Sequence, residues 1–269
     1  MAPRFVYLQP VLLLLDPSRR PVIGHRGNRA HAPENTLVSF AQAVGVGVDA
    51  IECDVHLSRD GVPVVMHDPT LDRTTDASGP IADRTVAELQ RVDAGARFST
   101  DGGRTTPYRG LGIGVPTLEQ VLEEHPALPM LLEIKARAAA GPVLATLQRA
   151  GATGRVLIGS FIDDALVPFA QAGIPVGAAT RALAQLYLPA LLGARPDSLP
   201  FQAMCIPRRY RGLPLPVARF ARLMRSHGGA THLWTVNDAA LARRLWARGV
   251  NGIISDDPAA ILAERGSAA

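Results

Sequence analysis

Short apolar runs alternate with amphipathic stretches along most of this chain, and no other feature of the sequence constrains its fold more. Eight of the runs have the length and residue types of strands, at Val22–Gly24, Ala50–Val55, Met130–Ile134, Val156–Ser160, Pro175–Ala179, Ala203–Ile206, Thr231–Val236 and Gly252–Ser255. We expect helices between them, at Thr36–Val46, Leu118–His125, Pro142–Ala150, Asp163–Ala172, Arg181–Leu192, Leu215–His227, Asp238–Arg248 and Pro258–Arg265. Strands that alternate with helices in this way predict an α/β protein with a closed parallel (β/α)8 TIM barrel.

The size and composition of the chain fit one such barrel. It has 269 residues, of which 47% are apolar and 19% charged, so it is long enough to bury a large core. We expect an N-terminal extension at residues 1–20 and a single barrel domain at residues 21–265. A polar, glycine-rich stretch at about residues 69–115 is expected to form a small insertion after the second strand, over the barrel mouth rather than as a second core. Cys53 and Cys205 have no disulfide or metal-ligand spacing, and we expect buried thiols.

The N-terminal segment and the overall charge limit the partners of the chain. Phe5 to Leu15 is apolar apart from Gln9, but it is too short to span a bilayer. We therefore expect a packed extra segment or a weak membrane-facing strip in preference to a signal peptide. The net charge of +4 favours an anionic substrate or an acidic membrane surface. The sequence has no basic run with interleaved aromatic residues, so we do not expect it to bind nucleic acid. We expect a cytoplasmic protein, with secretion and peripheral membrane association as the alternatives.

One further apolar run, Val62 to His67, does not fit the count of eight. Only Arg59-Asp60-Gly61 separates it from the second strand, which is too short for a parallel crossover. Asp-Gly between apolar runs predicts a two-residue hairpin turn, which pairs Arg59 with Val62 and Asp54 with His67. This register places His67 beside Asp54 at the barrel mouth.

Acidic residues gather where the strands of such a barrel end, which is where barrel active sites lie. Glu52 and Asp54 are two residues apart on the second strand, so both point the same way, and Glu133 ends the third strand. Three carboxylates at one mouth repel one another, and their oxygens suit a hard divalent cation such as Mg²⁺ or Ca²⁺. The alternative is that each carboxylate pairs with an arginine.

Histidines and basic residues lie at the same strand ends. His25 and His67 come from different elements, and beside a metal site two imidazoles supply the acid and the base that hydrolysis of a phosphodiester needs. Arg26 and Lys135 are suited to bind phosphate oxygens. Lys135 is the only lysine among 28 lysine and arginine residues, which indicates that this position requires an amine.

These residues together resemble the glycerophosphodiester phosphodiesterase family. The matching segments run in order from residue 21 to 258 and comprise Gly24–Gly27, Ala32–Thr36 with Phe40, Glu52–Val55, Asp60-Gly61, His67-Asp68, Leu71 with Arg73–Thr75, Pro116–Glu119, Leu132–Lys135, Ser160-Phe161, Trp234–Asn237 and Gly252–Asp256. The resemblance implies a barrel with an insertion after the second strand.

The resemblance also implies the roles of individual residues. It implies a metal held by Glu52, Asp54 and Glu133, acid–base work by His25 and His67, and phosphate contact by Arg26 and Lys135. Glu34 and Asn35 are expected to cap the first helix and brace the His25-Arg26 turn, and Trp234 is expected to be a wall of the pocket or a plain core residue. The chain departs from the family pattern at Arg97 to Gly114 and at Cys205 to Arg209, and both stretches could line the side of the leaving group.

The sequence therefore predicts metal-dependent hydrolysis of a small-molecule glycerophosphodiester to glycerol 3-phosphate and an alcohol. Cleavage of a single-chain lysophospholipid, as by a lysophospholipase D, is the alternative within enzymes. A non-catalytic phosphate-binding barrel is the alternative of another class. An aldolase-type barrel with Lys135 as a Schiff base is a more distant alternative.

Overall fold

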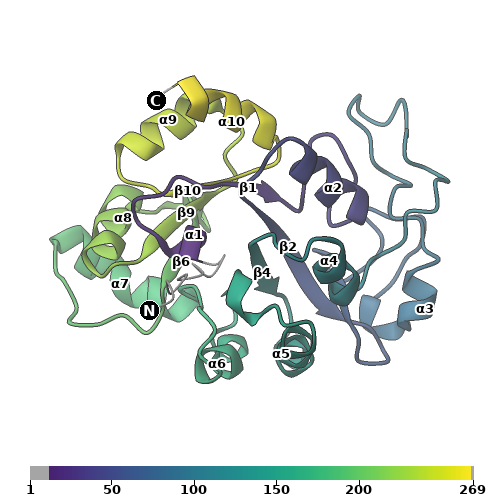
Figure 1. The fold of residues 1–269 in the computed structure, drawn as a ribbon, viewed down its shortest axis with the longest axis horizontal. Helices are drawn as coiled ribbons and strands as arrows, with labels where there is room; N and C mark the ends of the chain where they lie inside the picture. The colour runs from purple at the N-terminus through teal and green to yellow at the C-terminus, as the bar shows by residue number, and fades with distance from the viewer. Residues whose placement is uncertain (1–11, 268–269) are drawn as a thin grey trace, which may run out of the picture.

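A nearly closed barrel of parallel strands forms the centre of the molecule, which is a computed structural model that describes residues 12–267 (Figure 1). Hydrogen bonds join seven parallel strands in the order β5-β4-β2-β1-β10-β9-β6. Their bounds are β1 Val22–His25, β2 Ala50–Leu57, β4 Met130–Ile134, β5 Val156–Gly159, β6 Ala203–Pro207, β9 Ala230–Trp234 and β10 Gly252–Ser255. The architecture is the predicted TIM barrel.

The eighth position of the barrel is held by a bridging segment, so the strand expected at Pro175–Ala179 is wrong. Val176 pairs only with Ile158 on one side and Gly177 only with Ala203 on the other. Pro175 has no N–H to give to a ladder, and Gly177 has no side chain to pack on a pleated surface. The segment still closes the barrel, because Gly177 N donates to Ile158 O and Ala178 N donates to Ala203 O.

Helices cover the outside of the barrel, and their apolar faces form one large core with the outward residues of the strands. Each helix lies where the sequence predicts one, at α2 Leu37–Gly45, α4 Leu118–Glu124, α5 Ala140–Arg149, α6 Asp163–Gln171, α7 Thr180–Leu192, α8 Val217–Ser226, α9 Ala239–Ala247 and α10 Pro258–Ser267. Thr36 and Thr117 cap α2 and α4 by accepting a backbone N–H, as strong N-cap residues do. α7 ends at Gly193 in the left-handed conformation.

A short N-terminal helix, α1 (Leu12–Leu15), packs on the inside of the barrel. Leu14 is fully buried in a cluster with inward-facing strand residues, among them Ile23, Leu157 and Ile254. Its carbonyl oxygen accepts a hydrogen bond from His232 Nε2 at 2.7 Å. The expected packed segment is thus present at residues 12–15, whereas residues 1–11 lie outside the described part of the chain.

β3 (Pro63–Val65) pairs antiparallel with β2 as a hairpin, but one residue away from the predicted register. Val55 faces Val65 and Leu57 faces Pro63, so Asp54 lies opposite Met66 and the pairing of Asp54 with His67 is wrong. The turn has three residues instead of two, because Ser58 N donates to Val62 O and Gly61 takes a left-handed φ of 76°. The chain leaves the strand after Val65, and His67 nevertheless reaches the barrel mouth.

The insertion contains the 3₁₀ turn η1 (Ile81–Asp83) and the short helix α3 (Val86–Leu89), and it packs beside the hairpin. It has a small apolar cluster, since Leu71, Ile81 and Leu89 are buried against Val64. The insertion therefore packs against the hairpin through a small cluster of its own, apart from the large core of the barrel. Two further 3₁₀ turns are η2 (Arg137–Ala139) and η3 (Thr153–Arg155), and a two-residue hairpin, β7 (Arg209–Tyr210) with β8 (Leu213–Pro214), follows β6. Among residues 12–267, no helix combines the length and the apolar character needed to cross a bilayer.

Candidate active site

Three carboxylates from neighbouring strands converge at the C-terminal end of the barrel. Glu52 and Asp54 lie on β2, and Glu133 lies opposite Asp54 on β4. One oxygen from each lies within 4.8 Å of the others, a separation at which one cation can bind all three. Glu52 and Asp54 are almost fully buried, so their charges depend on positive groups nearby.

The turn that follows β1 brings Arg26 to this cluster. Arg26 has a left-handed φ of 53°, and this conformation directs its backbone N–H to Glu52 Oε2 at 3.0 Å. Its side chain lies with Nε 3.1 Å from Asp54 Oδ2. Gly27 makes the turn feasible, because a Cβ at this position would lie 2.4 Å from Ser39 Oγ.

Lys135 bridges two of the carboxylates. Its Nζ lies 2.8 Å from Asp54 Oδ1 and 2.7 Å from Glu133 Oε1. Asn35 Nδ2 donates to the other oxygen of Asp54, at 2.9 Å. The alternative in which each carboxylate pairs with an arginine holds only for Asp54, because Glu133 pairs with Lys135 and Glu52 accepts only the backbone N–H of Arg26.

The acidic residues of the cluster differ in electrostatics. Burial raises the pKa of Glu52 well above its usual value, and Asp54 beside it adds to the shift. Burial also raises the pKa of Glu133 despite Lys135. Burial acts in the same direction on Asp54, but Lys135 and Arg26 outweigh it and lower the pKa of that carboxyl. Two cationic side chains for three carboxylates leave a negative excess, and this donor set of hard oxygens fits a divalent cation.

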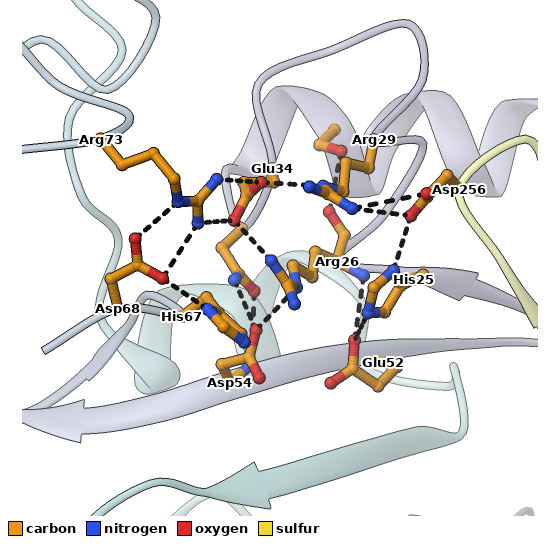
Figure 2. Close-up of polar contacts among 12 residues, drawn as sticks. His25, Arg26, Arg29, Glu34, Glu52, Asp54, His67, Asp68, Arg73 and Asp256 are labelled. Atoms are coloured by element: carbon orange, nitrogen blue, oxygen red, sulfur yellow. Dashed lines mark hydrogen bonds and ion pairs between the residues drawn. The ribbon is translucent and has the colours of Figure 1, made fainter. Parts of the chain in front are cut away.

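Each of the two predicted histidines is held by an aspartate. His25 Nδ1 lies 2.6 Å from Asp256 Oδ1, and His67 Nδ1 lies 2.6 Å from Asp68 Oδ1 (Figure 2). When each carboxylate accepts the Nδ1–H, each neutral ring keeps its lone pair on Nε2. His25 Nε2 points to the acidic cluster, 4.0 Å from Glu52 Oε2, and His67 lies beside Asp54.

Glu34 joins the two histidine–aspartate pairs through arginines. Arg29 Nε donates to Glu34 Oε2 at 2.8 Å, and its guanidinium also donates to Asp256. On the other side Arg73 donates to both oxygens of Glu34 and to both oxygens of Asp68. We call the chain Asp256–Arg29–Glu34–Arg73–Asp68 the carboxylate–arginine chain (Figure 2).

The charge of Glu34 is stabilised by its surroundings. Burial raises the pKa of this carboxyl, but hydrogen bonds and charges from Arg73, Arg26 and Arg29 outweigh burial and lower the pKa far below its usual range. Glu34 and Asn35 were expected to cap the first helix and to brace the His25-Arg26 turn. The first part is wrong, because Thr36 is the N-cap. The second is confirmed, because Arg26 Nη1 donates to Glu34 Oε1 and Asn35 N donates to Arg26 O. Glu34 binds arginines, and Asn35 binds Asp54.

A cavity of about 370 Å³ opens beside these groups, and its walls differ sharply. Polar side chains from β1, β2, the hairpin and β4 line one side: His25, Arg26, Glu52, His67, Glu133 and Lys135. The opposite side is apolar and includes Phe161, Leu183, Tyr187, Tyr210, Leu213 and Trp234. The cavity therefore suits a ligand with an anionic group at one end and an apolar part at the other.

Trp234 lies in the cavity wall, as the first of its two expected roles requires, and its ring contacts Phe161 edge-on at a centroid distance of 6.1 Å. The two stretches that depart from the family pattern differ in position. No residue of Arg97 to Gly114 lines this cavity, whereas Cys205 and Pro207 do. Cys53 is buried and Cys205 half-buried, both are free thiols, and burial raises the pKa of each.

Sequence reasoning gave no role to Asp256, Arg29 or Arg73 and paired none of them with a histidine. Asp68 directly follows His67, so its contact is local. Asp256 is 231 residues away from His25, and only the closure of β10 against β1 brings the two together. Asp256 and Arg73 belong to segments used for the family resemblance, but spacing along the chain does not reveal their contacts.

Comparisons with known proteins agree with this geometry. The sequence profile of the glycerophosphoryl diester phosphodiesterase family matches residues 25–260. The chain is 30% identical over 258 residues to the glycerophosphodiester phosphodiesterase of Bacillus subtilis (strain 168), over 91% of this chain and 86% of the relative. It is also 30% identical to the glycerophosphodiester phosphodiesterase of Caldanaerobacter subterraneus subsp. tengcongensis, over 90% of this chain and 96% of the relative.

Solved structures with the same fold carry the same description. The glycerophosphoryl diester phosphodiesterase domain of a Mycobacterium tuberculosis protein matches with a TM-score of 0.80 and 25% identity, over 93% of this chain and 100% of that chain. A phosphodiesterase of Oleispira antarctica, solved in complex with the product sn-glycerol-3-phosphate, matches with a TM-score of 0.72 and 27% identity, over 92% of this chain and 97% of that chain.

Proposed function

Because the chain belongs to the glycerophosphoryl diester phosphodiesterase family, we propose that it hydrolyses a small glycerophosphodiester to glycerol 3-phosphate and an alcohol in the cavity at the barrel mouth. One observation carries this proposal: two aspartate-held histidines flank a cluster of carboxylates in one cavity. The product bound to the Oleispira antarctica relative supports the identity of the phosphate product.

Glu52, Asp54 and Glu133 are proposed to hold a hard divalent cation, Mg²⁺ or Ca²⁺. The mutual distance of their oxygens, their burial and their negative excess support this assignment. When bound, such a cation would supply Lewis acidity to a phosphate oxygen and would orient the glycerol hydroxyls.

Arg26 and Lys135 are proposed to bind the phosphate. Both are held at the cluster by buried carboxylates, so their cationic groups face the cavity without a large loss of side-chain freedom on binding. As the phosphorus–oxygen bond to the alcohol breaks, they would stabilise the negative charge on the phosphoryl oxygens.

His25 and His67 are proposed to move the two protons of the reaction. One imidazole takes a proton from the attacking water through Nε2, while the other, protonated, gives a proton to the leaving alcohol oxygen. Asp256 and Asp68 fix each ring through Nδ1 and stabilise the charged form when it arises. The substrate's neighbouring hydroxyl is the alternative nucleophile and would give a cyclic phosphate first.

The proposal is tested by assaying release of glycerol 3-phosphate from a panel of glycerophosphodiesters. We expect wild-type protein to release it and the variants His25→Ala and His67→Ala to lose 10²- to 10⁴-fold in kcat while remaining folded. Near-normal turnover in either variant would remove the role assigned to that histidine. Tight binding of a phosphodiester without release of alcohol would favour the non-catalytic phosphate-binding barrel.

The apolar wall of the cavity supports a second substrate class. A lysophospholipid has the phosphodiester that the polar wall fits and an alkyl chain that Leu183, Tyr187 and Leu213 could cover. Each buried methylene contributes about 0.8 kcal/mol, which corresponds to about fourfold in affinity. Comparing glycerophosphocholine with lysophosphatidylcholines of increasing chain length distinguishes the two classes, because only the second predicts that kcat/KM rises with chain length.

A further inference from the structure

One face of α7 carries exposed apolar residues that continue the wall of the cavity. Ala184 and Tyr187 line the cavity, and Leu188 and Leu191 follow at helical spacing on the same face. Leu188 is 60% exposed and Leu191 is 38% exposed, whereas Leu186 on the opposite face is buried. An apolar stripe therefore runs from the cavity onto the molecular surface.

The β7–β8 hairpin extends this stripe. Leu213 lines the cavity and is still 64% exposed. Tyr187 Oη donates a hydrogen bond to Pro214 O at 3.1 Å, which ties α7 to the hairpin. Tyr210 of the hairpin stacks on Phe161, which is itself partly exposed at the cavity wall. We call Ala184, Tyr187, Leu188, Leu191 and Leu213 the α7 face.

The segment that contains the α7 face is strongly basic. Residues 180–227 contain a single acidic residue, Asp197, and eight arginines: Arg181, Arg195, Arg208, Arg209, Arg211, Arg219, Arg222 and Arg225. All eight are exposed. The chain as a whole has a net charge of only +4, so the remainder carries a net negative charge and the basicity is concentrated here.

These arginines are not neutralised by neighbouring acids. Within residues 12–267, the ion pairs of the molecule involve other arginines, such as Arg73 and Arg137, and none of these eight. Several donate only to backbone carbonyl oxygens, as Arg209 does to Gly212 and Arg219 to Leu191. Their positive charge is therefore available to an external anionic partner.

We propose that the α7 face docks onto a lipid bilayer with anionic headgroups and sets the mouth of the catalytic cavity against it. Peripheral binding needs two contributions, insertion of apolar side chains and attraction of basic residues to anionic lipid. The α7 face provides the first, and the exposed arginines of residues 180–227 provide the second. A second copy of the chain fits less well, because two equally basic faces would repel each other. Docking goes beyond the proposed hydrolysis, since a water-soluble phosphodiester needs no bilayer.

Sedimentation with lipid vesicles tests the proposal. We expect the wild-type protein to bind vesicles of equal parts phosphatidylcholine and phosphatidylglycerol, and to bind pure phosphatidylcholine much more weakly. Binding should fall in 1 M NaCl, where the Debye length is about 3 Å. The double variant Arg208→Gln/Arg211→Gln should lose about fivefold in partitioning for each arginine removed. The double variant Leu188→Asp/Leu191→Asp should lose at least tenfold.

Matched controls isolate the face. Arg244 and Arg248 are also exposed, and α9, which contains Arg244, lies apart from α7 in Figure 1, so Arg244→Gln/Arg248→Gln should bind vesicles like wild type. Val167 on α6 is 47% exposed and outside the α7 face, so Val167→Asp should also have little effect. Hydrolysis of glycerophosphocholine in solution should be unchanged in all four variants, which verifies that they fold.

Three results would overturn the proposal. One is equal binding of wild type to neutral and anionic vesicles, and another is unchanged binding by Arg208→Gln/Arg211→Gln and Leu188→Asp/Leu191→Asp. The third is a wild-type dimer in light scattering that becomes monomeric in Leu188→Asp/Leu191→Asp while neither protein binds vesicles, since the face would then be a self-association surface. If neither wild type nor any of the four variants hydrolyses glycerophosphocholine, the proposed function is contradicted. Vesicle binding still tests the docking proposal, because sedimentation does not depend on hydrolysis.

Discussion

Glu34 is the residue at which the two histidine–aspartate pairs meet. Its side chain is only 9% exposed, and Arg26, Arg29 and Arg73 all bind it. Arg29 and Arg73 each bind an aspartate that orients a histidine, so the positions of His25 and His67 depend on one carboxylate that lies in neither pair. We regard Glu34 as a positioning residue, because it touches the histidines only through other groups.

Removing the charge of Glu34 should therefore impair catalysis more than binding. We expect Glu34→Gln to lower kcat 10- to 100-fold, as substitutions that support site residues typically do, with a smaller change in KM. The matched control is Glu123→Gln on α4, because Glu123 is exposed and outside the site. Steady-state kinetics with thermal unfolding measures both, and a loss of stability with normal kcat in the folded fraction would reduce Glu34 to a structural role.

The two halves of the carboxylate–arginine chain, Arg73–Asp68 and Arg29–Asp256, should have different effects on the pH dependence of kcat/KM. Arg73→Ala disconnects Asp68 from Glu34, and Arg29→Ala disconnects Asp256, so each variant loosens a different histidine. A bell-shaped profile of kcat/KM reports the acid and the base separately. We expect Arg73→Ala to move one limb of the profile and Arg29→Ala to move the other. Identical shifts of the pH profile in both variants would contradict this expectation and would show that the carboxylate–arginine chain acts on both histidines together.

At the scale of elements, the alternation of apolar and amphipathic segments was enough to locate the barrel. The helix at Asp163 and the strand at Met130 begin at the predicted residues, because burial dictates both the 3.6-residue and the continuous apolar patterns. The predictions of one turn and one strand were wrong, and in both cases the local backbone explains the difference. Gly61 makes a three-residue turn where two residues were predicted, and Pro175 with Gly177 leaves only bridges where a strand was predicted.

The candidate site was predictable where its residues lie at strand ends and unpredictable where loops supply the partner. Period-two spacing placed Glu52 and Asp54 on one face of β2, and parallel pairing with β4 brought Glu133 opposite Asp54. The contacts of Arg29, Arg73 and Asp256 depend on how three loops meet above the barrel, and no periodicity encodes that meeting.

Buried His232, which binds α1 inside the barrel, should make the stability of the protein depend on pH. Burial lowers the pKa of His232 to about 4, although its hydrogen bond to Leu14 O opposes the shift. The unfolded chain, with a histidine pKa of about 6.5, takes up the proton first as pH falls. This contribution to stability is therefore complete above pH 6.5 and is lost as the pH falls to 4, by about 3 kcal/mol.

Urea unfolding of wild type and His232→Gln between pH 7 and pH 4 measures this contribution. We expect the free energy of unfolding to fall more steeply in wild type, because glutamine keeps a donor for Leu14 O but does not titrate. Other titrating groups, including Glu52 and Glu133, cancel in the comparison of the two proteins. Parallel curves for the two proteins would contradict the assignment of this dependence to His232.

At the scale of the whole molecule, one side of the barrel mouth is polar and the other side is apolar. The acids, the histidines and the cationic side chains lie on or shortly after β1, β2, β3 and β4, while β5, α7, β6, the β7–β8 hairpin and β9 supply the apolar wall. The basic surface belongs to residues 180–227. The polar side agrees with the chemistry of the family, and the apolar side is where this chain can select its alcohol or its membrane. The two sides share one cavity, and they meet where β4 pairs with β5.

Above all, we propose that Glu52, Asp54 and Glu133 together hold a cation that hydrolysis requires. The most direct test follows release of glycerol 3-phosphate from glycerophosphocholine by chelator-treated protein during titration with Mg²⁺ or Ca²⁺, for wild type and for Glu52→Gln. We predict no release by the treated wild type, recovery as one of the ions is added, and little recovery at any concentration in Glu52→Gln. Full activity of the wild type after chelation, together with normal activity of Glu52→Gln, would contradict the claim.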